Sequence, residues 1–435
     1  MTDQAPGPLA RFVKAIRRRI DPGGDAAREH IRRVAETLPG FAEQTGKQMR
    51  AQRKAVLALE HEIASQRRGI LRLTSGLNWM RRAVARQRRV NADLLRMAGL
   101  DEKTAEHEQR LRQRMERLAR SNLPIIVGPW SGEVGFELLY WIPFLQGLRQ
   151  AYPIDPARLI VISRGGVRAW YAHVGGEYVE TFDLTTPEAF REATEAVKKQ
   201  RNPRGFEKGL VKAAMRARGL TRVHLIHPSL MYELFWAYWA YRATLSHVDR
   251  FASFRRLPPA AGALPPGLPP EYVAVRFYFS DCFPDTPANR DFVARTIDAL
   301  TARTHVVLLN TPFSVDDHSD FVAARSDRVH TIAEHMVPPT NLATQTAVIA
   351  NARAFVGTYG GYAYLAPFYG VNAVAFYSRT TFKRQHLDLA HRVFERLGTI
   401  RLLPVDLRAV DPAELAFGGA PLSVAAPAPR ATARS

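Results

Sequence analysis

The sequence predicts an α/β protein with two parallel-sheet domains, preceded by a helical coiled-coil extension. Three observations predict this class. From residue 121 onward, apolar runs typical of buried strands alternate with helical segments, and such alternation is typical of parallel sheets covered by helices. A Pro/Gly-rich segment divides that region into two halves of similar size. A seven-residue apolar repeat precedes the whole region.

The N-terminal extension is strongly basic. Residues 1–122 hold 27 Lys and Arg against 14 Asp and Glu, so they carry most of the net charge of +20. In the basic segment 1–48, Phe12, Ile16 and Ile20 share one helical face among basic residues. This pattern suits an anionic membrane surface, or a solvated basic helix. Nucleic acid is a disfavoured partner because no RNA-recognition or zinc-finger motif accompanies the charge.

Residues 49–120 are expected to form a coiled coil or one long helix. Between Met49 and Ala98, mainly apolar residues recur at seven-residue spacing over seven heptads, with a second set interleaved. That repeat predicts a coiled coil. Asn91 at a core position of the repeat favours a coiled coil of two helices, and hence a homodimer. The alternative is a single helix packed on its own chain.

Seven strands and six helices are predicted beyond the extension. The strands are expected at Pro124–Val127, Arg158–Ser163, Arg222–His227, Tyr272–Phe279, His305–Asn310, Ala354–Gly357 and Ala373–Ser378. The helices are expected at Glu137–Tyr152, Pro187–Gln200, Gly209–Arg218, Arg290–Arg303, Asn341–Asn351 and His386–Leu397. In this order each strand can pair in parallel with a later one, with a helix covering the crossover.

These elements form two Rossmann-like domains, residues 121–256 and 271–405. The segment between them, residues 257–270, reads LPPAAGALPPGLPP and is the part of the chain richest in Pro and Gly. Such composition is typical of an interdomain linker. Residues 406–435 form a tail that we expect to be partly disordered.

The composition also restricts the compartment. A single cysteine, Cys282, excludes an intramolecular disulfide framework and is typical of a reducing cytosol. The N-terminus lacks the apolar run of a secretory signal. The longest apolar stretch, residues 230–245, is interrupted by Glu233 and Arg242, so no segment reaches the roughly 18 residues of a spanning helix. We expect a cytoplasmic protein, peripheral to the inner face of the membrane if the basic segment binds lipid.

A glycine-rich turn in the second domain suggests a phosphate site. The strand there ends at Val356, residues 357–361 read GTYGG, and a helix begins near Tyr362. Small residues let the backbone approach a phosphate, and the helix N-terminus offers free N–H groups. Tight turns also use glycine for conformational reasons, so a plain turn is the alternative.

Two short segments resemble GT-B glycosyltransferases of the lipopolysaccharide heptosyltransferase type. Residues 341–378 are similar to the donor-binding half, which has a strand, a Thr/Gly turn, a helix ending Leu-Ala-x-x-x-Gly and a strand ending in an aromatic. The matching residues are Gly357–Thr358, Gly360–Gly361, Leu365–Ala366, Gly370 and Ala375–Phe376–Tyr377–Ser378. The family's Asp-Thr-Gly at the turn is Tyr359–Gly360–Gly361 here, and its helix His is Tyr364.

The second resemblance lies just after the first strand. The family carries Gly-Asp-Val there, followed within a helix by Pro-x-Leu. This chain has Gly132–Glu133–Val134 and then Pro143–Phe144–Leu145, with the spacing longer by four residues. The family's Asp is its catalytic base, so the resemblance implies that role for Glu133.

The resemblance implies a glycosyltransferase that is inverting and metal-independent. It would move a sugar from a nucleotide-diphosphate sugar to a surface-glycan acceptor, possibly a lipid-linked one, and would need no other cofactor. The second domain would hold the donor, and the first would present the acceptor. The alternative is a non-catalytic adaptor that binds a nucleotide-sugar or glycan and is organised by its coiled coil in polysaccharide assembly.

The chemistry of Glu133 suits a base. An inverting transfer needs one group to deprotonate the acceptor hydroxyl, and a carboxylate in a glycine turn at a strand's end faces the interdomain cleft. The alternative is an acid in the first turn of a helix, stabilised there by the helix dipole. Glu137, one turn further on, is expected to be structural.

The remaining candidates follow or lie within strands. A charge inside an apolar strand, such as Arg276, needs a partner, which a diphosphate or a buried ion pair can supply. The candidate donor-binding residues are Arg276, Arg290, Thr358, Gly360, Gly361 and Tyr362. The candidate acceptor-binding residues are Trp130, Arg164 and His227, for which ordinary packing or a satisfied core histidine is the alternative.

No metal site is predicted. Asp281, Asp285 and the acids of residues 316–320 could suggest one, but they show no strictly spaced Asp-x-Asp. We interpret them as polar loop residues.

Overall fold

The computed structural model describes residues 83–91, 101–195, 199–260, 264–312, 319–321, 326–398 and 402–409, with isolated positions at 29, 32, 33, 36, 47, 54, 77, 80 and 81. The chain divides into two units, residues 1–89 and 90–435. Most of the basic segment, of the heptad repeat and of the tail lies outside the described residues. The coiled coil, the homodimer and the membrane contact therefore stay predictions.

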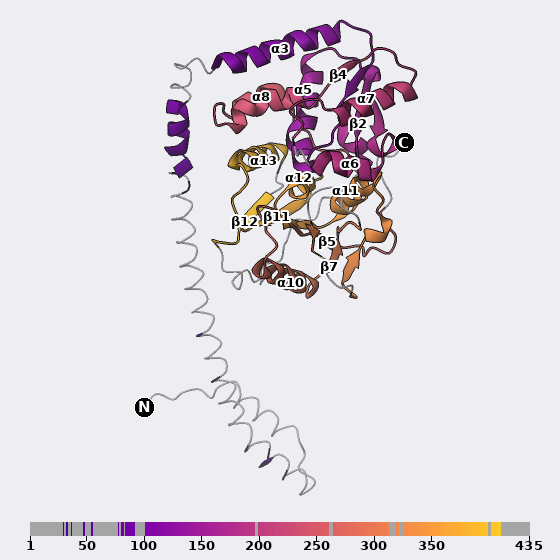
Figure 1. Ribbon diagram of the computed structural model, residues 1–435. Helices are drawn as coiled ribbons and strands as arrows, with labels where there is room; N and C mark the ends of the chain where they lie inside the picture. The colour runs from indigo at the N-terminus through magenta and orange to yellow at the C-terminus, as the bar shows by residue number, and fades with distance from the viewer. Residues whose placement is uncertain are drawn as a thin grey trace, which may run out of the picture. The chain divides into compact units, whose positions relative to one another are not determined.

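Helix α3 (Asp101–Ala119) packs against the first α/β domain (Figure 1). Its buried face contains Leu111, Met115 and Leu118, and Nη2 of Arg114 donates a hydrogen bond to the carbonyl of Leu225 at 2.7 Å. The sequence places this segment in the long helix of residues 49–120. In the structure, its apolar stripe covers the chain's own domain.

The first domain is built on a four-stranded parallel sheet with the strand order β3-β2-β1-β4. Its strands are β1 (Ile125–Val127), β2 (Leu159–Ser163), β3 (Glu177–Glu180) and β4 (His224–Ile226). Its helices are α4 (Val134–Phe136), α5 (Ile142–Ala151), α6 (Pro187–Glu195), α7 (Gly205–Ala217), α8 (Ser229–Trp239) and α9 (Leu245–Phe251). A π-helical turn (Glu137–Trp141) joins α4 to α5, so one helix runs on from the loop after β1.

The second domain contains a six-stranded parallel sheet with the order β12-β11-β10-β5-β7-β9. Its strands are β5 (Tyr272–Arg276), β7 (His305–Leu308), β9 (Val329–Thr331), β10 (Ala354–Thr358), β11 (Asn372–Tyr377) and β12 (Leu402–Asp406). A small antiparallel pair joins β6 (Tyr278–Phe279) to β8 (Ser319–Asp320). The helices are α10 (Pro287–Thr301), α11 (Asn341–Asn351), α12 (Gly361–Phe368) and α13 (Arg384–Leu397).

The predicted α/β class with parallel sheets is confirmed. In each sheet the first strand of the domain, β1 or β5, lies inside the sheet with a partner on both sides. The strand order reverses beside it, and ligands of open parallel sheets bind at such points, beyond the carboxyl ends of the strands. The loops that follow β1, β5 and β10 are therefore the natural place for a site.

The two domains pack on each other at several points. The backbone N–H of Ala343 donates to the carbonyl of Gly165 at 2.8 Å. Helix α13 returns to the first domain, beside α8 and the π-helical turn (Figure 1), where Nδ1 of His386 lies 2.7 Å from the Tyr140 hydroxyl. Leu257, the first residue of the predicted linker, is buried and hydrogen-bonds from its N–H to the carbonyl of Phe368. These contacts fix the relation between the sheets.

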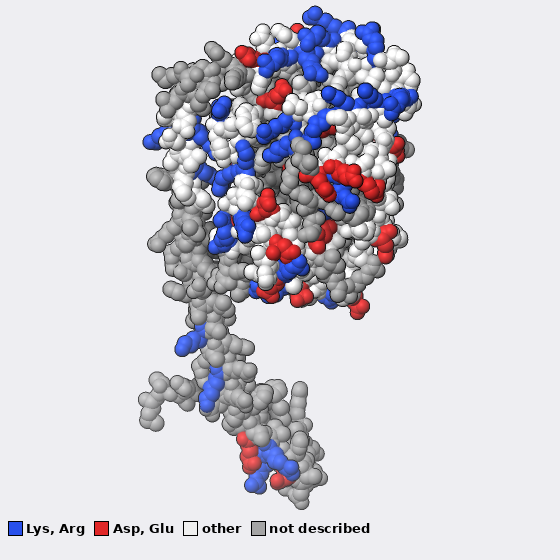
Figure 2. All heavy atoms as spheres, viewed as in Figure 1, with Lys and Arg blue, Asp and Glu red and all other residues white. Residues whose placement is uncertain are grey.

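Two further properties concern the surface. Figure 2 shows Lys and Arg side chains gathered over the upper part of the molecule, where the first domain lies in Figure 1. In the part of the chain that the structure describes, no helix is both long and apolar enough to cross a membrane.

Candidate functional site

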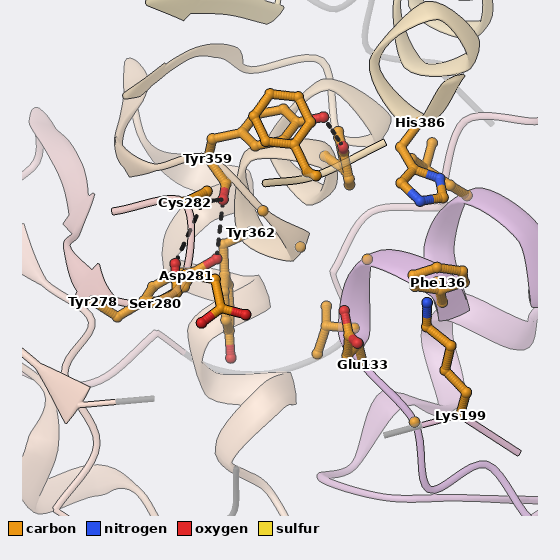
Figure 3. A pocket seen from close by; sticks show the side chains of 18 of the residues that line it. Glu133, Phe136, Lys199, Tyr278, Ser280, Asp281, Cys282, Tyr359, Tyr362 and His386 are labelled. Carbon is orange, nitrogen blue, oxygen red and sulfur yellow. Dashed lines mark hydrogen bonds between the residues drawn. The ribbon is translucent and has the colours of Figure 1, made fainter. Parts of the chain in front are cut away.

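A pocket of about 530 Å³ lies between the two domains, at the carboxyl edges of both sheets. The first domain contributes residues 131–136 and 139–140, with further side chains from α6 and the loop after it. The second contributes residues 280–282 and 359–362, and residues 381–383 just before α13. Figure 3 shows the two walls facing each other.

Glu133 lies on the first-domain wall, directly before α4. Its backbone is extended, with φ −67° and ψ 143°, and its side chain makes no capping hydrogen bond to the helix. The residue is exposed and lines the pocket. Figure 3 places it across the pocket from Asp281. The carboxylate thus faces the space where a ligand would lie, and is not used as a helix cap.

Glu137 has a different role, in the π-helical turn behind Glu133. Its side chain is fully buried, and its Oε1 accepts hydrogen bonds from the hydroxyls of Ser163 and Tyr171, both at 2.6 Å. Burial raises the pKa of Glu137 from 4.5 to about 7, although Arg164 and the two hydroxyls act in the opposite direction. Glu137 therefore anchors the helix to the end of β2.

Of the three candidate acceptor-binding residues, only Arg164 lines the pocket. Its Nη2 donates to the carbonyl of Gly132 at 2.9 Å, which braces the loop that carries Glu133. Trp130 is fully buried and stacks on Trp141 with 5.9 Å between ring centroids. His227 is also buried.

His227 lies in the core, where one of its two ring nitrogens is hydrogen-bonded. Its Nδ1 accepts a hydrogen bond from the backbone N–H of Ser229 at 3.1 Å, and its Nε2 lies 3.5 Å from a carboxylate oxygen of Glu207. Neither His227 nor Trp130 lines the pocket. Both side chains turn into the core, as the packing alternative expects.

The candidate donor-binding residues also separate into two groups. Arg276, Gly360, Gly361 and Tyr362 line the pocket. The Thr358 hydroxyl instead joins β10 to β6, since it bonds to both the N–H and the carbonyl of Tyr278, at 3.0 and 2.8 Å. Arg290 is exposed and pairs with Asp285, with 2.6 Å between Nη2 and Oδ2. Thr358 and Arg290 are not among the lining residues.

Arg276 presents a fixed positive charge to the pocket. The side chain is buried, and its Nε lies 3.2 Å from Oδ1 of Asp320. Its Nη1 donates to the amide oxygen of Gln345 at 2.8 Å, and its guanidinium lies 4.3 Å from the centre of the Tyr362 ring. The ion-pair alternative thus holds for Arg276, but the group also remains on the pocket wall.

The two glycines of the turn are required by close approach. A Cβ atom on Gly360 would collide with the Tyr278 hydroxyl, and one on Gly361 would lie 2.8 Å from the backbone nitrogen of Gly135. The N-terminus of α12 therefore meets the start of α4 at the pocket. Because helix N-termini carry partial positive charge, this meeting point favours a bound anion.

Several lining residues have no signal in the sequence. They are Tyr140, Lys199, Lys383 and His386, and the pocket also contains Cys282 and Asp281, which the sequence predicts only as a polar loop residue. The His386 ring is close to the aromatic ring of Phe136, with 5.0 Å between centroids. The pKa of His386 is lowered from 6.5 to about 3, mainly by burial and also by the charges of Lys199 and Lys383. The ring is thus neutral, and its Nδ1 can accept the hydrogen bond of Tyr140.

Metal ligands do not gather in the described part of the chain, where no group of three or more His, Cys, Asp or Glu side chains could hold an ion. Asp316, Asp317 and His318 lie outside the described residues.

Neither a protein-family model nor a curated protein matches the chain. Among solved structures, the E. coli ADP-heptose lipopolysaccharide heptosyltransferase II is 13% identical, with 60% of this chain and 86% of that one covered and a TM-score of 0.35. A family 9 glycosyltransferase from Veillonella parvula is 14% identical, with 58% and 80% covered and a TM-score of 0.35. The E. coli heptosyltransferase WaaC, solved with ADP-2-deoxy-2-fluoro heptose, is 14% identical, with 60% and 90% covered and a TM-score of 0.31.

These neighbours are of the type that the two sequence segments resemble. With TM-scores below 0.5, the likenesses identify neither the substrates nor the site residues of this chain. Those are inferred from the pocket.

Proposed function

We propose that the protein is a glycosyltransferase that moves a sugar from a nucleotide-diphosphate sugar to a hydroxyl of a glycan acceptor. One observation carries the proposal: Glu133 of the first domain and Gly360–Gly361 of the second line the same pocket. They belong to the two segments that resemble heptosyltransferases, and they are far apart in the sequence. A volume of about 530 Å³ lies within the usual range for small-molecule sites.

Glu133 is the proposed general base. As the acceptor oxygen bonds to the anomeric carbon, its proton passes to the Glu133 carboxylate. The bond from the anomeric carbon to the diphosphate oxygen breaks with its electron pair, and a nucleoside diphosphate leaves. Attack from the side opposite the leaving group inverts the anomeric centre.

Positive groups on the second-domain side would stabilise the departing diphosphate. The N-terminus of α12 contributes backbone N–H groups at Gly361 and Tyr362. Arg276, which Asp320 and Gln345 hold in place, contributes a charge that needs little rearrangement during the reaction. This arrangement supports a transfer in which protein groups, without a metal ion, offset the leaving-group charge.

The proposal is tested first by ligand binding. Purified full-length protein is heated with each common nucleoside diphosphate and with the matching nucleotide-sugars. One nucleotide series should raise the melting temperature, since a ligand at 100 times its Kd adds about 2.7 kcal/mol of stability. If no nucleotide raises it, the donor role fails. Binding without hydrolysis or transfer, and without any effect of Glu133→Gln, would instead favour the non-catalytic adaptor.

A further inference from the structure

An exposed tryptophan with two cations over its ring lies beside Lys383, a residue of the pocket wall. Trp236, on α8, is 43% exposed. Its ring centre lies 5.2 Å from Cζ of Arg201 and 5.6 Å from Nζ of Lys383. Lys383 also lines the pocket and donates a hydrogen bond to the carbonyl of Trp239 at 2.8 Å. Trp236 is thus linked to the pocket through Lys383.

Lys199 extends this positive region into the pocket. Its Nζ lies 5.2 Å from the centre of the Phe136 ring, and Figure 3 shows the two beside Glu133. The pKa of Lys199 is lowered, mainly by burial. The charge of Glu133 raises this pKa, whereas the charges of Arg201 and Lys383 lower it. These effects place Arg201, Lys383 and the proposed base within electrostatic reach of Lys199.

In the described part of the chain, no salt bridge joins Lys199, Arg201 or Lys383 to a carboxylate, although the charge of Glu133 acts favourably on Lys199. Other cations of the pocket are paired: Arg191 lies 3.7 Å from Glu195, and Arg276 lies 3.2 Å from Asp320. Grouped like charges destabilise one another. A bound anion would relieve that repulsion.

We infer that the acceptor is a glycan with an anionic group, a phosphate or a carboxylate. It binds to four residues that we call the Trp236 cluster: Lys199, Arg201, Lys383 and Trp236. A sugar ring packs against the exposed part of the indole, while the cations form charge-assisted hydrogen bonds to the anion. The inference rests on the proposed function, because it specifies the acceptor of that reaction.

The position of the cluster separates it from the donor. Lys199 lies on the Glu133 side, whereas Gly360, Gly361 and Arg276 form the facing wall (Figure 3). Lys383 belongs to the second domain but is tied to α8 of the first. An anion held here brings a neighbouring hydroxyl of the same glycan toward the base.

The test titrates the full-length protein with three probes: methyl glucoside 6-phosphate, methyl glucuronide and neutral methyl glucoside. Each titration is done with and without a saturating nucleoside diphosphate, which keeps the phosphate probe out of the donor site. At least one anionic probe should bind about tenfold more tightly than the neutral one, and should bind less tightly as salt increases. The stronger of the two anionic probes identifies the anion as phosphate or carboxylate.

Variants then assign the binding to the cluster. Lys199→Gln and Lys383→Gln should each weaken the anionic probe about fivefold, as expected for a partly exposed charge, and leave nucleoside diphosphate affinity unchanged. Trp236→Ala should weaken all three probes. The matched control is Arg384→Gln, because Arg384 follows Lys383 but pairs with Asp388 and does not line the pocket.

Three results would overturn the inference: equal affinity for neutral and anionic probes, no binding of any probe, or a loss of nucleoside diphosphate affinity in the lysine variants. The last would assign the cations to the donor. The proposed function fails separately: if no nucleoside diphosphate stabilises the protein while anionic sugars still bind at Lys199 and Lys383, the glycosyl transfer is wrong but the anion site stands.

Discussion

Gly135 and Gly361 meet across the boundary between the two α/β domains. A Cβ atom on Gly361 would lie 2.8 Å from the Gly135 nitrogen and 2.9 Å from Cβ of Val134. The first helix of one domain and the turn of the other thus approach each other backbone to backbone. Both glycines line the pocket, so the domain contact and the pocket share one set of residues.

Gly361→Val should therefore separate the domains locally. We expect the free energy of unfolding to fall by about 1–3 kcal/mol, the usual cost of overpacking, and nucleoside diphosphate binding to weaken with it. Urea unfolding and calorimetry measure the two effects. The control is Gly209→Ala in α7, where a new Cβ meets nothing within 4 Å, and stability should stay the same or rise by up to about 1 kcal/mol. A Gly361→Val protein as stable as wild type would contradict the close approach.

Glu133→Gln should lower turnover by about 10²- to 10⁴-fold, the usual contribution of a general base. The amide keeps the size of the side chain, so affinity for nucleoside diphosphate should not change. Steady-state kinetics and calorimetry check both expectations. The matched control is Glu195→Gln, because Glu195 also lines the pocket but pairs with Arg191, and its turnover should stay close to wild type. If Glu133→Gln keeps full turnover, Asp281 on the facing wall becomes the candidate base.

Glu137 should make stability depend on pH. Its pKa is raised from 4.5 to about 7 in the folded protein, so the folded state holds a proton that the unfolded chain releases. The resulting stabilisation is complete below about pH 4.5 and is lost as the pH rises through about 7.

Glu137→Gln removes this titration but keeps an oxygen for Ser163 and Tyr171. The fall in unfolding free energy between pH 5 and pH 8 should be smaller in the variant by an amount on the order of 2 kcal/mol. Urea titrations of both proteins at the two pH values provide the measurement. Parallel pH profiles would show that the Glu137 carboxyl titrates as in water.

Arg276 and Arg290 should behave differently when truncated. Arg276→Ala removes the ion-pair partner of Asp320, whose side chain is only 9% exposed and also accepts a hydrogen bond from Thr311, and we expect a loss of about 3–5 kcal/mol of stability. Adding Asp320→Asn should restore part of that stability, but nucleoside diphosphate affinity should remain low, since the pocket has lost a positive charge. Thermal unfolding and calorimetry of the single and double variants separate the two effects.

Arg290→Ala is the comparison for Arg276, because Arg290 is exposed and pairs with Asp285 outside the pocket. An exposed ion pair contributes about 0–1 kcal/mol, so stability and nucleotide affinity should both stay near wild type. A reduction in affinity equal to that of Arg276→Ala would place the diphosphate near α10.

The sheets were largely predictable from the sequence because their central strands are short apolar runs. Strands β1, β2, β5, β7, β10 and β11 fall within the predicted ranges or differ from them by one residue. Strands β3, β9 and β12 were missed. The first two read EYVE and VHT, and all three lie at sheet edges. Edge strands need few apolar residues. Whether such a segment becomes a strand depends on its pairing in the folded protein, which the local sequence pattern does not show.

The pocket was predictable only in part. Glu133, Gly360 and Gly361 follow strands and carry a turn signal in the sequence. Position after a strand does not decide where a side chain points, however, and His227 therefore turned into the core. Lys199 and Lys383 lie in loops among many other cations, and only the tertiary fold brings them together.

Helix α13 comes late in the chain, yet it completes the aromatic core of the first domain. His386 packs against Phe136, Tyr140 and Trp239, and the Tyr238 hydroxyl donates to the carbonyl of Gln385 at 2.7 Å. During translation, the first domain therefore emerges from the ribosome before α13 can cover these rings. Until α13 emerges, that surface is open to chaperones and to aggregation. A nascent chain that stops before α13 also lacks Lys383 and His386. The pocket is therefore complete only after these two residues have been synthesised.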